Sequence, residues 1–413
     1  MSVSKLLIIV VALFAFAGCK HIAATREGAG VPAQPFQISA PGIDAAEPAT
    51  AAAGDGTFYV AWVNHDAKQA DVMLAHFNHK AEMQGAPVRV NRQPGVATAW
   101  RGDQPSVAVA PDGAVYVLWT ARVDAGDKHG TDIYLSASTD RGQSFASEVK
   151  VNDDKAPGPH GMHSLAVAKD GRIYAGWLDE RNVHMPEPST KAEGHHMESN
   201  RDLYVATSTD GGRSFSANRK VASEACPCCK TSLAVSAEGT LYAGWRQVLP
   251  GNYRHIAVAS STDGGTKFSA PVIVSDDRWM LQGCPVSGPS LSVDNGSGSL
   301  KIVWFAAGEG GAPGVYFAES KDKGRSFSPR QLLSQETVRG TPALAAGNQS
   351  MIAVWQSADT AETKMHEIGT AGSALSIAVN AELPAGAFAN DKLFVAYIAN
   401  EKEKRSIWLS PAR

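Results

Sequence analysis

One eight-residue pattern, Ser-x-Asp-x-Gly-x-x-Phe, occurs four times in this chain and constrains its fold more than any other feature. The copies lie at 138–145, 208–215, 261–268 and 320–327. In such a turn the aspartate can accept hydrogen bonds from backbone N–H groups, and the glycine supplies a positive φ. We therefore expect a tight hairpin turn in each copy, with the phenylalanine packed beneath it. A pattern repeated at spacings of about 50 to 70 residues indicates an array of similar units.

A second repeat indicates the number of units. A short apolar strand that ends in an aromatic residue occurs seven times, beginning at residues 58, 115, 173, 241, 301, 351 and 393. A partner strand and a glycine-containing turn precede most copies. A third strand follows, then usually the Asp-containing turn, and then a fourth strand. Four short strands per unit are typical of the blades of a β-propeller. The sequence therefore predicts an all-β propeller of four-stranded antiparallel blades.

The four-copy pattern resembles the Asp box of the sialidase superfamily, which is also called the BNR repeat. This resemblance implies a propeller of six blades, whereas the seven aromatic strands favour seven, so six remains the alternative. The last unit lacks a fourth strand before the chain ends at residue 413. The segment 35–39, Pro-Phe-Gln-Ile-Ser, could supply that strand from the N-terminus and so close the ring without an open edge.

The first residues resemble the signal of a bacterial lipoprotein. Lys5 precedes an apolar run that is too short for a membrane span, and Gly18 and Cys19 follow. Cleavage before Cys19 would leave its thiol to carry a lipid, and Lys20 in the next position favours the outer membrane. An ordinary secretory peptide is the alternative. We expect a signal peptide at 1–18, a tether at 19–34 and a single propeller domain at 35–413.

The overall charge excludes some partners. The net charge of −3 and the isoelectric point near 6.5 provide no general attraction to nucleic acid or to an anionic membrane surface. Of the 413 residues 44% are hydrophobic, which suits one large domain. We expect contact with a membrane only through the lipid on Cys19, and no nucleic-acid partner.

Arginines gather in the loops that this topology places opposite the Asp-containing turns. Ligands of propellers usually bind at the mouth of the channel on that face. A guanidinium binds carboxylate, sulfate or phosphate groups through two parallel hydrogen bonds. The alternative is that the arginines only form salt bridges between neighbouring blades. The five residues that could rim one funnel are Arg101, Arg122, Arg181, Arg246 and Arg339.

The resemblance to sialidases also implies particular roles. In that family three arginines hold the carboxylate of the substrate, a tyrosine paired with a glutamate is the nucleophile, and an aspartate is the acid. The implied arginine triad is Arg101, Arg246 and Arg339. Tyr253 would be the nucleophile, Glu180 its partner and Asp103 the acid.

Four cysteines lie in two neighbouring loops on the same predicted face. Cys226, Cys228 and Cys229 form a Cys-Pro-Cys-Cys segment, and Cys284 lies in the next entering loop. Disulfide bonds are one interpretation, because an exported protein meets an oxidising compartment. A thiolate metal site and free reactive thiols are the other two.

Nearby histidines and methionines support a soft metal. His160, Met162 and His163 enter the neighbouring blade, and the insert 182–201 contains three further histidines and two methionines. Thiolate, thioether and imidazole ligands together favour copper, with zinc second. The spacing matches no standard zinc motif, and isolated histidines in a polar insert are commonly only exposed.

These features predict an exported, lipid-anchored, sialidase-like propeller. Its funnel, lined by arginines and cysteines, would bind an acidic sugar or another anionic ligand. If the protein is an enzyme, the resemblance implies a sialidase-type glycoside hydrolase. The alternative is a non-catalytic propeller that handles copper or zinc through the cysteine cluster or binds a protein partner.

Overall fold

The computed structural model describes residues 34–67, 69–99, 102–125, 128–183, 199–294, 296–347, 350–401 and 404–412. Within these ranges every regular element is a β-strand. A helix long and apolar enough to cross a membrane is not found in the described residues. The strands pair with antiparallel neighbours, as the alternation of apolar strands and turns predicts.

The strands follow one another in four-stranded units. The first unit contains β2 (Asp44–Ala52), β3 (Phe58–Asp66), β4 (Gln69–Phe77) and β5 (Val88–Arg89). The second contains β7 (Ser106–Val109), β8 (Val115–Ala125), β9 (Lys128–Ser138) and β10 (Val149–Lys150), with β6 (Ala97–Thr98) beside β8. The third contains β11 (His160–Val167), β12 (Ile173–Asp179), β13 (Arg201–Ser208) and β14 (Arg219–Ala225). The fourth contains β15 (Ser232–Val235), β16 (Leu241–Leu249), β17 (Tyr253–Ser261) and β18 (Val272–Ile273).

Three further units follow in the described chain. The fifth contains β19 (Ser290–Val293), β20 (Leu300–Ala306), β21 (Gly314–Ser320) and β22 (Gln331–Ser334). The sixth contains β23 (Val338–Ala346), β24 (Met351–Ser357), β25 (Glu362–Glu367) and β26 (Leu375–Val379). The last contains β27 (Ala381–Ala389), β28 (Lys392–Glu401), β29 (Lys404–Pro411) and the N-terminal β1 (Phe36–Gln37).

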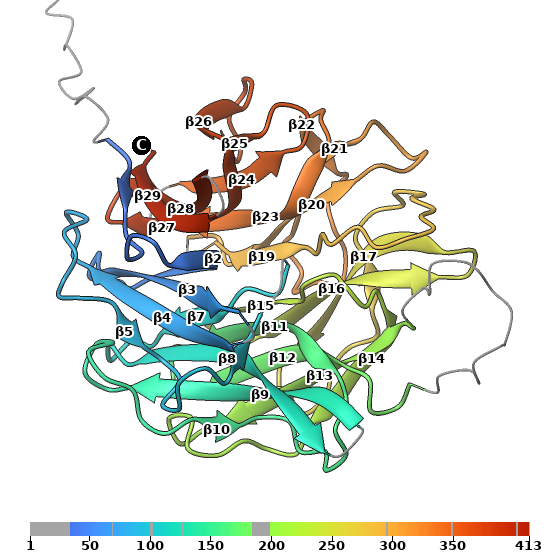
Figure 1. Ribbon diagram of the computed structural model, residues 1–413. Helices are drawn as coiled ribbons and strands as arrows, with labels where there is room; N and C mark the ends of the chain where they lie inside the picture. Colours follow the sequence, from blue (N-terminus) through green and yellow to red (C-terminus); the bar gives the residue numbers. More distant parts are fainter. Residues whose placement is uncertain are drawn as a thin grey trace, which may run out of the picture.

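The first strand of each unit lies toward the middle of the molecule (Figure 1). In the described part of the chain these strands contact one another in order, from β2 through β7, β11, β15, β19 and β23 to β27, and β27 returns to β2. The result is the closed ring of a β-propeller, so the predicted fold class is confirmed. The blade count stays a prediction, because one bridge between Ala225 and Gln247 joins the third and fourth units into a single sheet.

The N-terminal strand closes the ring as predicted. Phe36 pairs with Leu409 and Gln37 with Trp408, which places β1 on the outer edge of the last unit. The backbone N–H of Ile38 then donates to the carbonyl of Ile407 at 2.8 Å. Because β1 covers the free edge of β29, residues from the two ends of the described chain belong to one sheet.

The aromatic strands of the sequence are the second strands of the units. Six of them end near a buried tryptophan whose indole N–H donates to a polar side chain, which satisfies the only polar atom of the ring. Three of the acceptors are carboxylates: Trp177 donates to Asp179 and Trp304 to Asp277, both at 2.8 Å, and Trp355 donates to Glu336 at 3.0 Å. These tryptophans fill the space between neighbouring sheets and form much of the core.

The four Asp-containing turns have the predicted structure. In the first, Asp140 accepts the backbone N–H of Ser144 at 2.9 Å, and the N–H of Gly142 donates to the hydroxyl of Ser138 at 2.8 Å. Slight burial raises the pKa of Asp140, but hydrogen bonds from Ser138 and Ser144 outweigh it and hold that pKa at about 2. The carboxylate is therefore a structural acceptor within its own turn.

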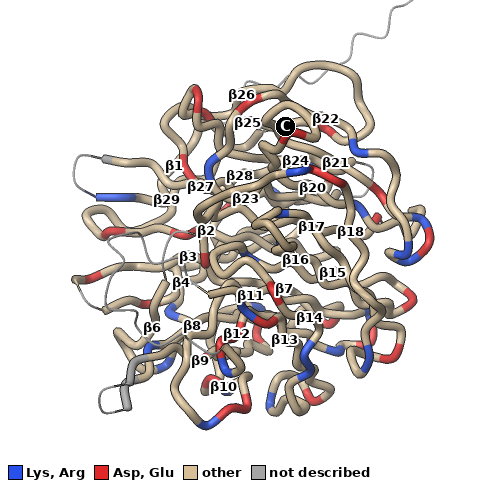
Figure 2. The backbone as a smooth tube through the Cα atoms, turned by 90° about the vertical axis from the view of Figure 1, so that its right-hand side faces the viewer, with Lys and Arg blue, Asp and Glu red and all other residues tan. Residues whose placement is uncertain are grey.

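Each turn also positions the neighbouring unit. A Cβ atom added at Gly142 would lie 2.9 Å from Cδ2 of Leu74 in β4, and one at Gly212 would lie 2.4 Å from Cδ2 of Leu135 in β9. The turn of one unit thus packs against the third strand of the preceding unit. Along the backbone, residues of both charge signs are interspersed (Figure 2).

Candidate functional site

A cavity of about 230 Å³ lies where the innermost strands meet. Segments of β2, β7, β11, β15, β19, β23 and β27, or residues directly before them, all line it. The cavity therefore lies on the propeller axis, where ligand sites of this fold class occur. Its wall combines hydroxyl groups, prolines and aliphatic side chains with one ammonium group, that of Lys230.

Irregularities in the inner strands change the direction of the chain around this cavity. β-Bulges interrupt the pairing of β2, β11, β23 and β27 just before their lining segments. Three non-glycine residues with positive φ sit inside these bulges: Glu47 at 55°, Met162 at 53° and Leu383 at 47°. Left-handed backbone at such residues costs about 1–3 kcal/mol each and clusters at functional sites. Left-handed backbone at three positions around one cavity therefore supports this cavity as the candidate functional site.

Hydroxyl groups of the lining bond the inner strands to one another. Ser164 Oγ lies 2.8 Å from Thr231 Oγ1, and Thr50 Oγ1 donates to the carbonyl of Gly386 at 2.8 Å. The N–H of Leu344 donates to Ser290 Oγ at 3.0 Å. Such bonds replace the ladder that the innermost edge strands lack, so the hydroxyls first serve the fold.

Lys230 spans two units and contributes the positive charge of the cavity. Its Nζ donates to the carbonyl of Gln104 at 2.7 Å and lies 3.5 Å from Oδ1 of Asp103, which is 3% exposed. Burial lowers the pKa of Lys230, and the Asp103 carboxylate opposes that shift. The predicted acid Asp103 thus lies beside the cavity as a buried counter-ion of Lys230.

His163 links the same region to the second unit. Its Nδ1 lies 3.0 Å from Ser106 Oγ, and its Nε2 lies 3.8 Å from Oδ1 of Asp103. Burial and the charge of Lys230 lower the pKa of His163 to about 3, although Asp103 opposes them. Ser106, His163 and Asp103 are the residue types of a hydrolase triad, but 3.8 Å exceeds a hydrogen bond, and Ser106 Oγ also donates to the His163 carbonyl at 3.1 Å. We interpret this group as a structural link.

His160, another predicted metal ligand, is engaged by carboxylates. Its Nε2 lies 3.3 Å from both Asp154 and Asp179, and its Nδ1 lies 2.5 Å from the carbonyl of Thr131. Burial lowers the pKa of His160, but the two carboxylates outweigh it and raise that pKa to about 10. Both ring nitrogens of His160 thus face oxygen atoms of the fold, and its contacts with Asp154 and Asp179 are those of an ion-pair network. Asp132, Asp154 and His160 also lie close enough together to share one ion.

Arg181 belongs to this network rather than to an open rim. Its guanidinium contacts Asp179 at 2.8 Å and Asp153 at 2.6 Å, and its Cζ lies 4.5 Å from the ring centroid of Tyr204. Arg330 is arranged in the same way in the fifth unit, where it pairs with Asp277 and covers Tyr316, also at 4.5 Å. A contact set that recurs in two units is explained by packing between blades.

The remaining predicted arginines in the described part of the chain have different surroundings. Arg246 is fully buried, donates to the carbonyls of Ser287 and Phe305 at 2.7 and 2.8 Å, and covers the ring of Trp279. Arg122 and Arg339 are exposed on β8 and β23. Arg101, Cys19 and residues 184–198 of the histidine-rich insert lie outside the described residues.

Tyr253 and Glu180 contact different groups. Tyr253, 37% exposed, opens β17, where its ring lies 6.4 Å from that of His255 and its backbone pairs with Met280. Glu180 follows β12 and accepts Arg201 Nε at 2.6 Å. Arg201 also donates to the carbonyl of Pro227, so Glu180 serves to hold the cysteine loop.

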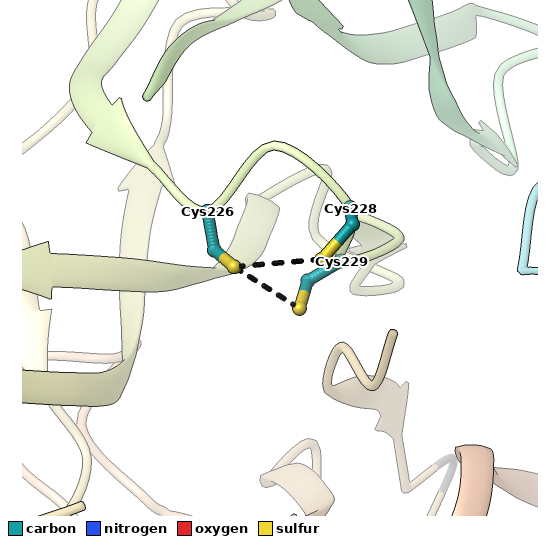
Figure 3. A group of neighbouring side chains, drawn as sticks. All are labelled: Cys226, Cys228 and Cys229. Atoms are coloured by element: carbon teal, nitrogen blue, oxygen red, sulfur yellow. Dashed lines mark hydrogen bonds between the residues drawn. The ribbon is translucent and has the colours of Figure 1, made fainter. Parts of the chain in front are cut away.

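The four cysteines gather at one place, as predicted from their loops. Cys228 and Cys284 form a disulfide whose Cα atoms are 6.1 Å apart, while Cys226 and Cys229 are free and buried. The sulfur of Cys226 lies 3.5 Å from that of Cys229 and 3.9 Å from that of Cys228 (Figure 3). The disulfide interpretation is therefore correct for one pair.

Two buried arginines act on the free thiols. A hydrogen bond from Cys229 lowers the pKa of Cys226 to about 7, and the charges of Arg254 and Arg246 add to this effect against burial. Burial and the neighbouring Cys226 raise the pKa of Cys229. Arg246 Nη1 and Arg254 Nε and Nη1 are buried without hydrogen-bond partners in the described residues. The cluster is thus a dithiol in a positive, water-excluded environment.

Sequence reasoning did not single out Lys230 and Gln104 as site residues. A recurring proline was the available signal, because Pro48, Pro105, Pro289, Pro342 and Pro384 all line the cavity. Proline is tolerated on an edge strand, and the innermost strand of a blade is an edge. The repeated proline therefore marked the axis of the propeller, although it could not identify the polar side chains there.

The ring of sheets around an axial cavity defines a β-propeller. Residues 56–278, more than half of the chain, match the family model described as the BNR repeat-like domain. The chain therefore belongs to the BNR repeat-like family, which agrees with its Asp-containing turns. No curated protein sequence matches it.

Solved structures share the fold at low sequence identity. The Hadza microbial sialidase Hz136 superposes with a TM-score of 0.57 at 14% identity, covering 81% of this chain and 68% of the sialidase. The ulvan lyase of polysaccharide lyase family PL25, bound to a repeat of GlcA and Rha3S, gives 0.58 at 12%, with 92% and 96% covered. The Penicillium chrysogenum alpha-L-arabinanase complexed with arabinobiose gives 0.51 at 14%, with 76% and 95% covered. At these identities the likeness shows the fold alone.

Proposed function

We propose that this protein is a sugar-binding propeller that accommodates a negatively charged sugar unit in the axial cavity. Lys230 would provide the cation, and Gln104 would accept a hydrogen bond from a sugar hydroxyl. Structures with this fold include a sialidase and a lyase bound to a GlcA-containing repeat, which supports an acidic glycan as the ligand class.

The unpartnered amide oxygen of Gln104 carries this proposal. Gln104 lines the cavity, and its Oε1 is buried without a hydrogen-bond partner in the described structure. A buried amide oxygen left unpaired costs about 1–3 kcal/mol, so a ligand that donates a proton there is favoured. Lys230 lies in the adjoining wall, with its ammonium bonded to the backbone carbonyl of the same glutamine.

The size of the cavity limits the ligand. Its volume of about 230 Å³ is below the range of about 300–1,000 Å³ that accommodates drug-sized ligands. One sugar ring, such as the end of a chain, suits this space better than an oligosaccharide. The aliphatic wall from Leu165, Leu233 and Leu344 offers apolar surface to the carbon face of that ring.

A more specific version of the proposal is that the protein hydrolyses the bound glycan. A sialidase-type reaction would need Tyr253 and a neighbouring glutamate to act together, but Glu180 is bonded to Arg201. The geometry therefore supports binding better than catalysis. Release of fluorophore from a fluorogenic sialoside by the wild-type protein, with Tyr253→Phe as the control, tests this form directly.

Calorimetric titration tests the binding proposal. We expect D-glucuronate or N-acetylneuraminate to bind the full chain more tightly than the neutral counterparts glucose and N-acetylmannosamine. Lys230→Met should remove the preference for the acid, and Gln104→Leu should weaken acidic and neutral sugars together, by about 10-fold.

The control variant is Arg172→Gln, because Arg172 lines a separate surface pocket beside an Asp-containing turn. It should bind sugars as the wild type does. Because Lys230→Met leaves Asp103 unpaired, thermal melting must show that the variant is folded, and Gln104→Leu provides an independent test. Equal affinity for acidic and neutral sugars, or unchanged binding by both cavity variants, would contradict the proposal.

We also propose, from residues 1–20 alone, that the protein is exported and anchored in the outer membrane through lipid on Cys19. Metabolic labelling with a radioactive fatty acid, followed by membrane fractionation, tests this placement. The wild type should carry label in the outer-membrane fraction, whereas Cys19→Ala should carry none. Label retained in that variant would contradict the anchor.

A further inference from the structure

Cys226 and Cys229 bring two free thiols together within one tight turn. The segment Cys-Pro-Cys-Cys leaves β14, and the N–H of Cys229 donates to the carbonyl of Cys226 at 3.3 Å. This turn brings the two sulfurs to 3.5 Å from each other. Two thiolates bind a two-coordinate ion in a nearly linear arrangement, so bonds of about 2.3 Å would set the sulfurs up to about 4.6 Å apart. Rotation of both side chains must therefore widen the pair by about 1 Å to admit an ion.

Backbone groups around the turn stabilise sulfur as an acceptor. The backbone of Cys228 hydrogen-bonds to the sulfur of Cys226, and the backbone of Ser287 hydrogen-bonds to that of Cys229. The turn itself is fixed by a bond of 2.8 Å from the N–H of Cys226 to the carbonyl of Arg246. Donors that point at both sulfurs favour thiolates over thiols.

The charge around the turn indicates an anionic occupant. Arg246 is 0% exposed and Arg254 is 3% exposed, and each has buried guanidinium nitrogens without a hydrogen-bond partner in the described residues. Neither arginine forms a salt bridge with a described carboxylate at 4.0 Å or less. Two buried positive charges need compensation, and the neighbouring thiols, on which these arginines act, can become anionic.

The available ligands decide which ion fits. The cysteine group contains no histidine or carboxylate among the described residues, and the sulfur of Cys228 is committed to its disulfide with Cys284. Zinc in structural sites takes four ligands. Copper(I) is softer, accepts two thiolates and carries one positive charge, so its dithiolate complex is an anion. That anion complements Arg246 and Arg254.

We propose that Cys226 and Cys229 bind one Cu(I) ion as a pair of thiolates, beneath the intact Cys228–Cys284 disulfide. Binding forms two Cu–S bonds and releases two thiol protons to solvent. Copper enters and stays as Cu(I), so no electron is transferred. The site is separate from the axial cavity and does not depend on the sugar-binding proposal.

Anaerobic titration of the full chain with the acetonitrile complex of Cu(I), in competition with bicinchoninate, tests the site. The disulfide is kept by omitting reductant, and bound copper is counted by mass spectrometry of the metal. We expect one Cu(I) per chain, with Cys226→Ser and Cys229→Ser each weakening binding by more than about 100-fold. Arg254→Gln keeps both thiols and should weaken binding by about 10-fold through loss of charge.

Two controls separate the dithiol from its surroundings. Met162→Leu removes a buried thioether from the same cluster and should leave Cu(I) binding unchanged. Replacing Cys228 and Cys284 together by alanine removes the disulfide and should retain Cu(I). Any of three results overturns the proposal: peptide mapping that finds a Cys226–Cys229 disulfide in anaerobically purified protein, tighter binding of Zn(II) than of Cu(I), or unchanged copper in Cys226→Ser.

Discussion

His160 and His163 lie three residues apart on β11, are both buried, and have pKa values shifted in opposite directions. Successive side chains of a strand point to opposite faces of the sheet. The bulge between Gly161 and Ser164 lies between the two histidines and separates their environments. His160 meets two carboxylates, whereas His163 meets Lys230 as well as Asp103. The two carboxylates therefore favour the charged form of His160, whereas burial and Lys230 favour the neutral form of His163.

The first prediction concerns the pH dependence of stability at His160. Its folded-state pKa of about 10 exceeds the value of about 6.5 for an unfolded chain. Its contribution is therefore fully present below pH 6.5 and is lost as the pH rises toward 10. The difference in unfolding free energy between the wild type and His160→Gln should shrink by at least about 1 kcal/mol from pH 6 to pH 9, measured in urea.

His163→Gln is the matched control for that experiment. The depressed pKa of His163, about 3, gives a contribution that is present above about pH 6.5 and is lost as the pH falls toward 3. The difference between the wild type and His163→Gln should therefore grow, not shrink, from pH 6 to pH 9. A His160 difference that is constant over this range would show that the histidine is neutral in the folded protein.

The structure shows which features the sequence could predict. The turn at Asp140 depends on hydrogen bonds to residues at most four positions away, so its pattern is visible in eight letters. Lys230, by contrast, bonds to Gln104, which lies 126 positions away in the sequence, and no local pattern predicts that pairing. The residue type of Arg181 fits a ligand site and an ion-pair network equally well. Only the matching environment of Arg330 shows that packing explains it.

The second prediction tests that network. Arg181→Gln leaves the fully buried carboxylate of Asp179 without its guanidinium partner, at a cost of about 3 kcal/mol of unfolding free energy. Arg172→Gln removes a surface ion pair to Asp170, where both side chains are about a third or more exposed, and should cost less than about 1 kcal/mol. Equal destabilisation by the two variants in guanidinium denaturation would argue against an interior role for Arg181.

The third prediction compares two adjacent glycines in the second Asp-containing turn. Gly211 and Gly212 have positive φ values of 73° and 81°, so alanine is strained at both. A Cβ at Gly212 would lie 2.4 Å from Leu135, whereas at Gly211 the nearest atom is the hydroxyl of Tyr116 at 3.8 Å. Other copies of the turn already place Arg141 and Lys323 at the position of Gly211.

Gly212→Ala should therefore destabilise the protein by about 2 to 4 kcal/mol, and Gly211→Ala by about 1 kcal/mol. Thermal unfolding followed by circular dichroism would measure both. The comparison isolates the contact between units, because the backbone strain is common to the two variants. If the two substitutions cost the same, the turn does not position the neighbouring blade through Leu135.

The last prediction concerns the closure of the ring by the N-terminal segment. Ile38 is 4% exposed, packs in the cluster that contains residues of β2, β3, β27, β28 and β29, and its N–H bonds to Ile407. Ile38→Ala should lower the unfolding free energy by about 2 to 4 kcal/mol, since it opens space between the first and last units. Ile43, 41% exposed, is the matched control, and its replacement by alanine should change stability by less than about 0.5 kcal/mol. Because the closing strand holds together segments that are distant in sequence, Ile38→Ala should also speed proteolysis near β29 more than Ile43→Ala does. Similar stability and cleavage rates for the two variants would mean that the propeller is held closed without β1.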